Sequence, residues 1–97
     1  MRVVAKKVLR EFWTTHADAE HQLKTWYKEA SKADWYSPSD IKNEYTKASI
    51  LKNSRVVFNI CGGSYRLIVK INYQRQWVFV RFIGTHNDYD NIDAENI

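Results

Sequence analysis

The segment RFIGTHNDYD, residues 81–90, contains an arginine, a histidine and a tyrosine within ten residues. His86 can exchange a proton near neutral pH, Tyr89 can donate a hydrogen bond or a proton, and Arg81 can stabilise charge on a phosphate oxygen. RNA cleavage without a metal ion needs a base, an acid and a cation, because the 2′-hydroxyl can itself be the nucleophile. These residue types therefore suit cleavage of a phosphodiester bond in RNA.

The same segment has simpler interpretations. A lone histidine after a strand is more often a surface residue, and Tyr89 can equally be a packing residue in a C-terminal turn. The nearby acids could ligate a divalent cation, but aspartates that follow a strand more often cap a short helix, whose N-terminus favours negative charge. We therefore expect no cofactor, and no metal site formed by His86, Asp88, Asp90 and Asp93.

Basic residues are concentrated in one part of the chain, which has a net charge of +4. Residues 1–45 are nearly neutral, with eight Lys or Arg and seven Asp or Glu. Residues 46–87 contain seven Lys or Arg and no acid, and residues 88–97 contain four acids and no base. A basic block of this kind can contact nucleic-acid phosphates, although arginines on a sheet surface are also often simply solvated.

Three runs rich in β-branched and aromatic residues must position the candidate residues. They are RVVFNI at 55–60, SYRLIVKINY at 64–73 and WVFVRFIG at 77–84, and they predict an antiparallel meander. Gly62 and Gly63 predict a two-residue hairpin turn between the first two runs, because such turns need positive φ, which glycine adopts without steric cost.

Alternation along these runs separates an apolar face from a basic face. In the last run we expect Phe82 to share the apolar face with Val78 and Val80, and Ile83 to lie on the basic face. The basic face then combines charges for phosphates with rings on which bases can stack, as single-stranded nucleic acids require. Its expected members are Arg55, Arg66, Lys70 and Arg81, interleaved with Trp77 and Phe79.

The first half of the chain has helical periodicity. Residues 6–15 carry an apolar stripe of Val8, Leu9, Phe12 and Trp13; a second helix follows Asp18; and a third begins at Pro38, with Ser37 as its cap. Val3 and Val4 could form an N-terminal strand. The expected fold is α+β, with N-terminal helices packed on one face of a small antiparallel sheet, in a single domain spanning residues 1–97.

Cysteine and hydropathy patterns narrow the class of protein. Cys61 is the only cysteine, so the chain has neither an internal disulfide nor a thiol cluster for metal ligation. The charged residues among the first 13 do not suit a signal peptide, and no apolar run approaches the roughly 20 residues of a membrane span. We expect a soluble, cytoplasmic protein that does not act in a membrane.

The motifs RVVFNI, YRLIVKI and FIGTHNDYD, together with the terminal NIDAENI, resemble the HigB-type toxins of bacterial type II toxin-antitoxin systems, in the RelE-like superfamily. The resemblance covers nearly the whole chain. It implies a RelE-like fold and an mRNA interferase, usually independent of metal, that often cuts mRNA on the ribosome and so inhibits translation. It also implies a HigA-type antitoxin partner with a helix-turn-helix domain.

The resemblance also suggests roles for individual residues. Arg66 matches the basic residue that the superfamily places on its central strand to hold the scissile phosphate, and His86 falls where relatives have a basic residue or histidine. Some relatives use a lysine cluster before this strand as the base, and here Lys52 and Arg55 are the nearest substitutes. We predict His86, Arg66, Arg81 and Tyr89 as catalytic residues, and Lys70, Arg55, Lys52 and Trp77 as RNA-binding residues.

Two other functions use the same features. A non-catalytic RNA-binding or ribosome-binding protein would use the basic face only to contact phosphates. A gyrase-poisoning toxin on the related ParE-like scaffold would act on DNA. The histidine and the basic strand face favour RNA chemistry over the second of these.

Overall fold

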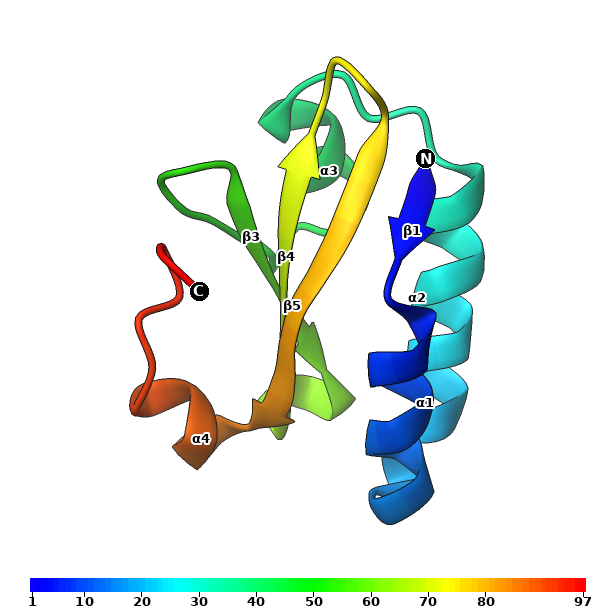
Figure 1. Ribbon diagram of the computed structural model, residues 1–97, viewed down its shortest axis with the longest axis vertical. Coiled ribbons are helices and arrows are strands. Elements are labelled where there is room, and N and C mark those ends of the chain that lie inside the picture. The colour runs from blue at the N-terminus through cyan, green and yellow to red at the C-terminus, as the bar shows by residue number, and fades with distance from the viewer.

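The computed structural model describes all 97 residues, and it confirms the predicted α+β fold (Figure 1). The helices are α1 (Lys6–Thr15), α2 (Glu20–Lys32), α3 (Pro38–Glu44) and α4 (His86–Asp90), with 3₁₀ turns η1 (Ala17–Ala19) and η2 (Cys61–Gly63). The strands are β1 (Arg2–Val4), β2 (Ser49–Ile50), β3 (Arg55–Ile60), β4 (Tyr65–Asn72) and β5 (Trp77–Thr85). No helix has the length and apolar character needed to cross a membrane.

The sheet has five strands in the order β1-β5-β4-β3-β2. Strands β3, β4 and β5 form the predicted antiparallel meander. Strand β1 is the expected N-terminal strand, but it pairs in parallel with β5, so the sheet is mixed and not purely antiparallel. The two-residue strand β2, antiparallel to β3, was not predicted, because it is too short to show an alternating pattern.

Helices α1 and α2 cover one face of the sheet and form the main core with it (Figure 1). Leu9 and Trp13 from α1 and Leu23 and Trp26 from α2 are buried, as their spacing of three or four residues predicts. The Trp26 ring packs edge-on against Phe58 of β3, with 5.4 Å between ring centroids. The apolar stripes therefore determine which face of the sheet the helices cover.

Two details of the helices differ from the prediction. Val8 is exposed, because it lies at the edge of the α1 stripe, about 100° around the helix from Leu9. Ser37 precedes α3 as expected, but its side chain makes no capping hydrogen bond. Instead the Asp40 carboxylate accepts a hydrogen bond from the main-chain N–H of Tyr36, at 2.9 Å.

The turn between β3 and β4 is longer than predicted. Ile60 and Tyr65 form the last pair of the hairpin, so the connection has four residues and not two. Cys61, Gly62 and Gly63 have φ values of 53°, 66° and 99°. The glycines adopt the predicted positive φ, but η2 adds residues to the turn.

A β-bulge changes which residues of β5 face the helices. Ile68 pairs with Phe82, whereas its neighbour Val69 pairs with Val80, so Arg81 is an extra residue in β5. Beyond the bulge the alternation is reversed. Phe82 therefore lies on the face away from α1 and α2, whereas Ile83 packs against the main core, and the predicted positions of these two residues were wrong.

Replacing Gly84 with alanine is expected to lower the free energy of unfolding by about 1–3 kcal/mol, as overpacking typically does. A Cβ atom at this position would lie 2.5 Å from Cζ of Phe82. Urea denaturation of Gly84→Ala, Phe82→Leu and the double variant measures the effect. The double variant should lose less stability than the sum of the two single changes, and strict additivity would contradict a steric cause.

Candidate active site

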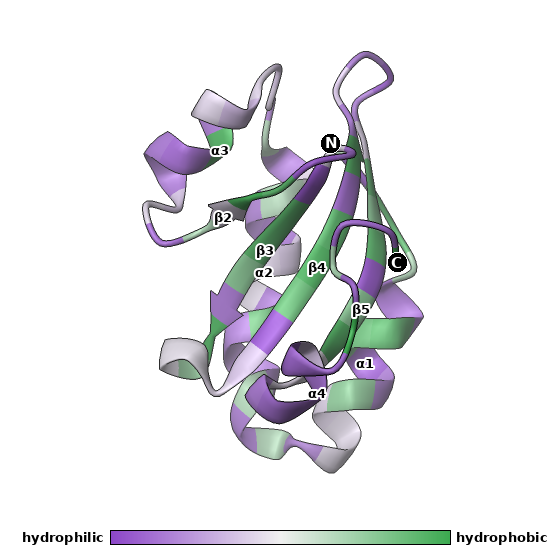
Figure 2. Ribbon diagram, turned by 90° about the vertical axis from the view of Figure 1, so that its left-hand side faces the viewer, coloured by the Kyte–Doolittle hydropathy of each residue, from purple (hydrophilic) through white to green (hydrophobic).

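The C-terminal part of the chain lies on the face of the sheet opposite α1 and α2. Figure 2 shows α4 and the segment that follows it in front of β4 and β5. Val57 and Ile68 are buried although they lie outside the main core cluster, as expected for apolar residues beneath this segment. The face that carries the basic residues is therefore partly covered.

Arg55 and Arg81 hold this C-terminal segment in place. Nε and Nη2 of Arg55 donate hydrogen bonds to the Ile97 carbonyl oxygen at 3.2 and 2.6 Å, and Nη1 donates to the Asn53 carbonyl at 2.8 Å. Arg81 Nε donates to the same Ile97 oxygen at 3.3 Å. Arg55 is only 9% exposed, so its guanidinium contacts the protein itself and little solvent.

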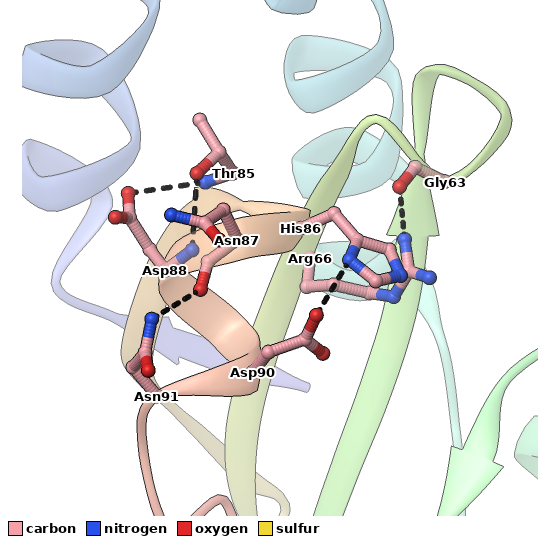
Figure 3. Close-up of polar contacts among 8 residues, drawn as sticks. All are labelled: Gly63, Arg66, Thr85, His86, Asn87, Asp88, Asp90 and Asn91. Atoms are coloured by element: carbon pink, nitrogen blue, oxygen red, sulfur yellow. Dashed lines mark hydrogen bonds and ion pairs between the residues drawn. The ribbon is translucent and has the colours of Figure 1, made fainter.

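A capping box begins α4 directly after β5 (Figure 3). The Asp88 main-chain N–H donates to Thr85 Oγ1 at 3.1 Å, and the Thr85 N–H donates to Asp88 Oδ2 at 3.4 Å. This confirms that an aspartate caps a short helix here. No three His, Cys, Asp or Glu side chains lie together in a group that could hold a metal ion.

Asp90 orients the His86 imidazole. His86 Nδ1 lies 3.0 Å from Asp90 Oδ2, one helical turn away, and the two side chains are 57% and 54% exposed. The main-chain N–H of His86 also donates to the Ser64 carbonyl, at 3.1 Å. With Nδ1–H held by the carboxylate, Nε2 is left to exchange a proton with a substrate. Asp90 was not predicted as a partner of His86, although their spacing of four residues is visible in the sequence.

The Arg66 guanidinium is held in position next to this helix. Its Nη1 donates to the Gly63 carbonyl (Figure 3), and its Cζ lies 5.7 Å from the centroid of the Tyr89 ring. Arg66 also pairs across the sheet with Gly84. The three ion pairs of the structure do not involve Arg66, so no carboxylate neutralises its charge.

The other predicted residues lie farther along the sheet. Lys70 is exposed on β4 opposite Arg55, and Trp77 begins β5 at its far end. Lys52 is exposed in the turn before β3, where its main-chain N–H donates to Glu95. The structure therefore brings together Arg66, His86 and Tyr89, with Asp90, at one end of the face, and separates them from Arg81, Arg55, Lys70, Lys52 and Trp77.

A further polar cluster joins η1 to the start of β4. The Tyr65 hydroxyl donates to Asp18 Oδ1 at 2.7 Å, and this hydrogen bond raises the pKa of Tyr65 to about 12. Cys61 Sγ donates to the Asp18 carbonyl, and burial raises the pKa of the thiol above its ordinary value. A raised pKa lowers the thiolate fraction at neutral pH, so Cys61 is a poor nucleophile.

The structure has one cavity, of about 380 Å³, between α2, α3 and β3. Trp26, Tyr45, Lys47 and Asn59 are among its lining residues, and the Tyr45 hydroxyl donates to Glu29 there at 2.6 Å. Burial, together with this hydrogen bond, raises the pKa of Tyr45. Neither His86 nor Arg66 lines the cavity. Because the His86 side chain is 57% exposed, the candidate active site is accessible to a polymer.

Comparisons with known proteins match a toxin family over most of the chain. A family model described as HigB_toxin, RelE-like toxic component of a toxin-antitoxin system, matches residues 19–92. The chain is also 22% identical over 94 residues to the mRNA interferase HigB of Escherichia coli O6:H1, an alignment that covers 95% of this chain and 91% of that relative. The matched range includes β3, β4, β5 and α4, and so every residue of the candidate active site.

Proposed function

The chain belongs to the HigB family of RelE-like toxic components of toxin-antitoxin systems, and we propose that it is an mRNA interferase, an endoribonuclease that inhibits translation. The observation that supports this most strongly is the grouping of a carboxylate-oriented histidine with an unneutralised arginine. The name of the Escherichia coli relative, mRNA interferase HigB, supports the proposal.

In the proposed reaction the 2′-hydroxyl of the RNA attacks the adjacent phosphorus atom. His86 Nε2 takes the proton of this hydroxyl, while Asp90 holds the opposite side of the ring. Arg66 stabilises the negative charge that builds on the phosphate oxygens. The bond to the 5′-oxygen then breaks, and the Tyr89 hydroxyl donates a proton to this leaving oxygen. The products are a 2′,3′-cyclic phosphate and a 5′-hydroxyl end.

The remaining predicted residues have secondary roles in this proposal. Lys70 and Lys52 are exposed and contact phosphates of the bound RNA, and Arg81 adds charge near the centre of the face. Arg55 stabilises the C-terminal segment, since its guanidinium is committed to Ile97 and Asn53. The reaction relies on Arg66 for its cation and on no metal ion.

We further propose that the substrate is mRNA on the ribosome, and that a HigA-type antitoxin with a helix-turn-helix domain neutralises the toxin. The resemblance to HigB-type toxins supports both statements, and the basic face could be covered by an acidic partner segment. A small helix-turn-helix gene directly adjacent to this one would support the pairing, and its absence would weaken it.

Primer extension on cellular mRNA after induction tests the proposed activity. New 5′ ends within coding sequences are expected, and a 2′-deoxy nucleotide at the cleavage position of a synthetic RNA should block cleavage by the purified protein. Translation arrest without new RNA ends would indicate a non-catalytic binder. DNA breaks with an SOS response would indicate a gyrase poison, and either result would contradict the proposal.

Replacing Asp90 with asparagine is expected to lower the cleavage rate about 1.4- to fivefold, because a half-exposed pair of this kind contributes roughly 0.2–1 kcal/mol. The loss should appear in kcat, since Asp90 orients His86 and does not itself contact RNA. Single-turnover kinetics of Asp90→Asn measure it, and Asp34→Asn, in the exposed loop before α3, is the control. Equal losses in both variants would contradict the positioning role of Asp90.

A further inference from the structure

A second group of basic and aromatic side chains lies at the far end of the same sheet face. Trp77 begins β5, and the parallel pairing of β1 places Arg2 directly beside it. Cζ of Arg2 and Cζ of Arg75 each lie 5.9 Å from the centroid of the Trp77 ring. The Phe79 ring packs edge-on against Trp77, with 5.7 Å between centroids. We refer to Arg2, Arg75 and Trp77 as the Trp77 cluster.

The charges of the Trp77 cluster are accessible and not neutralised. Arg2 and Arg75 are exposed, and Trp77 is partly exposed. None of the three ion pairs in the structure involves either arginine. Lys70, also exposed, pairs with Phe79 on the neighbouring strand and adds a third positive charge. The cluster therefore presents positive charge around an indole ring with no acid to balance it.

The Trp77 cluster is separate from the proposed active site. Arg66 and Asn72, the residue opposite Trp77, are six positions apart on β4, or roughly 20 Å at about 3.3 Å per residue. The Trp77 cluster and the proposed active site both lie on the face away from α1 and α2. Arg55 and Arg81, which lie between the two sites, donate hydrogen bonds to Ile97. The cluster is too far from His86 to take part in proton transfer.

We propose that the Trp77 cluster is a second RNA-binding subsite, occupied by a part of the RNA strand distant from the bond that is cut. The two guanidinium groups contact phosphates, and the indole stacks on a base, which is the combination that binds single-stranded nucleic acid without sequence preference. An acidic protein segment would use the charges but would gain little from a partly exposed indole. This subsite rests on the proposed function, in which RNA is the substrate.

Intrinsic fluorescence can report on this subsite directly. Trp13, Trp26 and Trp35 are at most 9% exposed, so Trp77 is the tryptophan that a bound base can reach. Binding is measured in a His86→Ala background, so that the RNA stays intact. An RNA of about 16 nucleotides, the upper range for one binding surface of this kind, should quench the fluorescence, whereas a trinucleotide bound at Arg66 should not.

The decisive variant combines Arg2→Gln with Arg75→Gln. Loss of two phosphate contacts should reduce the slope of log K against log salt by about 1.4, at roughly 0.7 per contact for single strands. The preference for the longer RNA over the trinucleotide should also fall. Arg2→Lys with Arg75→Lys should restore the slope, which separates lost charge from lost folding. Lys28→Gln with Lys32→Gln, exposed on α2, is the matched control.

An unchanged slope and preference in the Gln variant, or equal changes in the control, would overturn the subsite. Quenching by an acidic peptide but not by RNA would also overturn it, and would assign the cluster to a protein partner. A failure of the proposed function would give a different result. The wild type would cut no RNA, but RNA binding would still show the expected salt slope and would still quench Trp77. Conversely, if the protein cleaves RNA but bound RNA does not quench Trp77 fluorescence, only the proposed subsite is overturned.

Discussion

The His86→Ala variant is expected to cleave RNA about 10²- to 10⁴-fold more slowly than the wild type, the range typical of losing a general acid or base. His86 is the histidine at the junction of β5 and α4, where the Thr85 cap, the Ser64 carbonyl and Asp90 all constrain it. Alanine removes the proton-transfer atom and leaves the helix cap intact. Single-turnover cleavage of a defined RNA measures the effect without interference from product release.

The control is His21→Ala, because His21 is an exposed histidine on α2, a helix that covers the opposite face of the sheet from α4 (Figure 1). Both variants should unfold at nearly the same urea concentration as the wild type, since neither side chain is buried. In cells, His86→Ala should relieve growth arrest and His21→Ala should not. Growth arrest that persists unchanged in His86→Ala, with mRNA still cut, would remove His86 from the mechanism.

Replacing Arg66 with alanine is expected to lower kcat about 10²- to 10³-fold, as is typical when a group that stabilises charge in the transition state is lost. The Gly63 carbonyl and the Tyr89 ring hold the guanidinium, and no carboxylate competes for it. Arg66→Lys keeps the charge but not the planar fork that can bind two phosphate oxygens, so it should recover only part of the activity. Kinetics at saturating RNA separate this loss from weaker binding.

The matched control for Arg66 is Arg10→Ala, an exposed arginine on α1, remote from the proposed RNA-binding face. A general effect of net charge on RNA binding would lower the affinity of both variants equally. A specific role of Arg66 predicts a large loss of kcat in Arg66→Ala alone. A loss confined to KM would indicate that Arg66 binds RNA in the ground state and does not stabilise the transition state.

Much of the secondary structure could be predicted because it depends on neighbouring residues. The Lys6–Thr15 helix and the Arg55–Ile60 strand have the bounds that their periodicity indicates. An aspartate after β5 takes part in the helix cap, because the capping box joins Thr85 and Asp88, only three positions apart. By contrast, the bulge at Arg81 depends on how β5 pairs with β4. The regular alternation of side chains along β5, taken alone, therefore predicted the wrong faces for Phe82 and Ile83.

The candidate active site also combines features that the sequence alone predicts with features that depend on the tertiary structure. The sequence by itself determined the residue types that can transfer protons and hold phosphate, the basic block, and the face shared by Arg66 and Lys70. Only the tertiary structure decided that the C-terminal segment occupies Arg55 and that β1 places Arg2 beside Trp77. The physical reason is range: periodicity and capping act over a few residues, whereas these contacts depend on strand register and on the packing of segments distant in sequence.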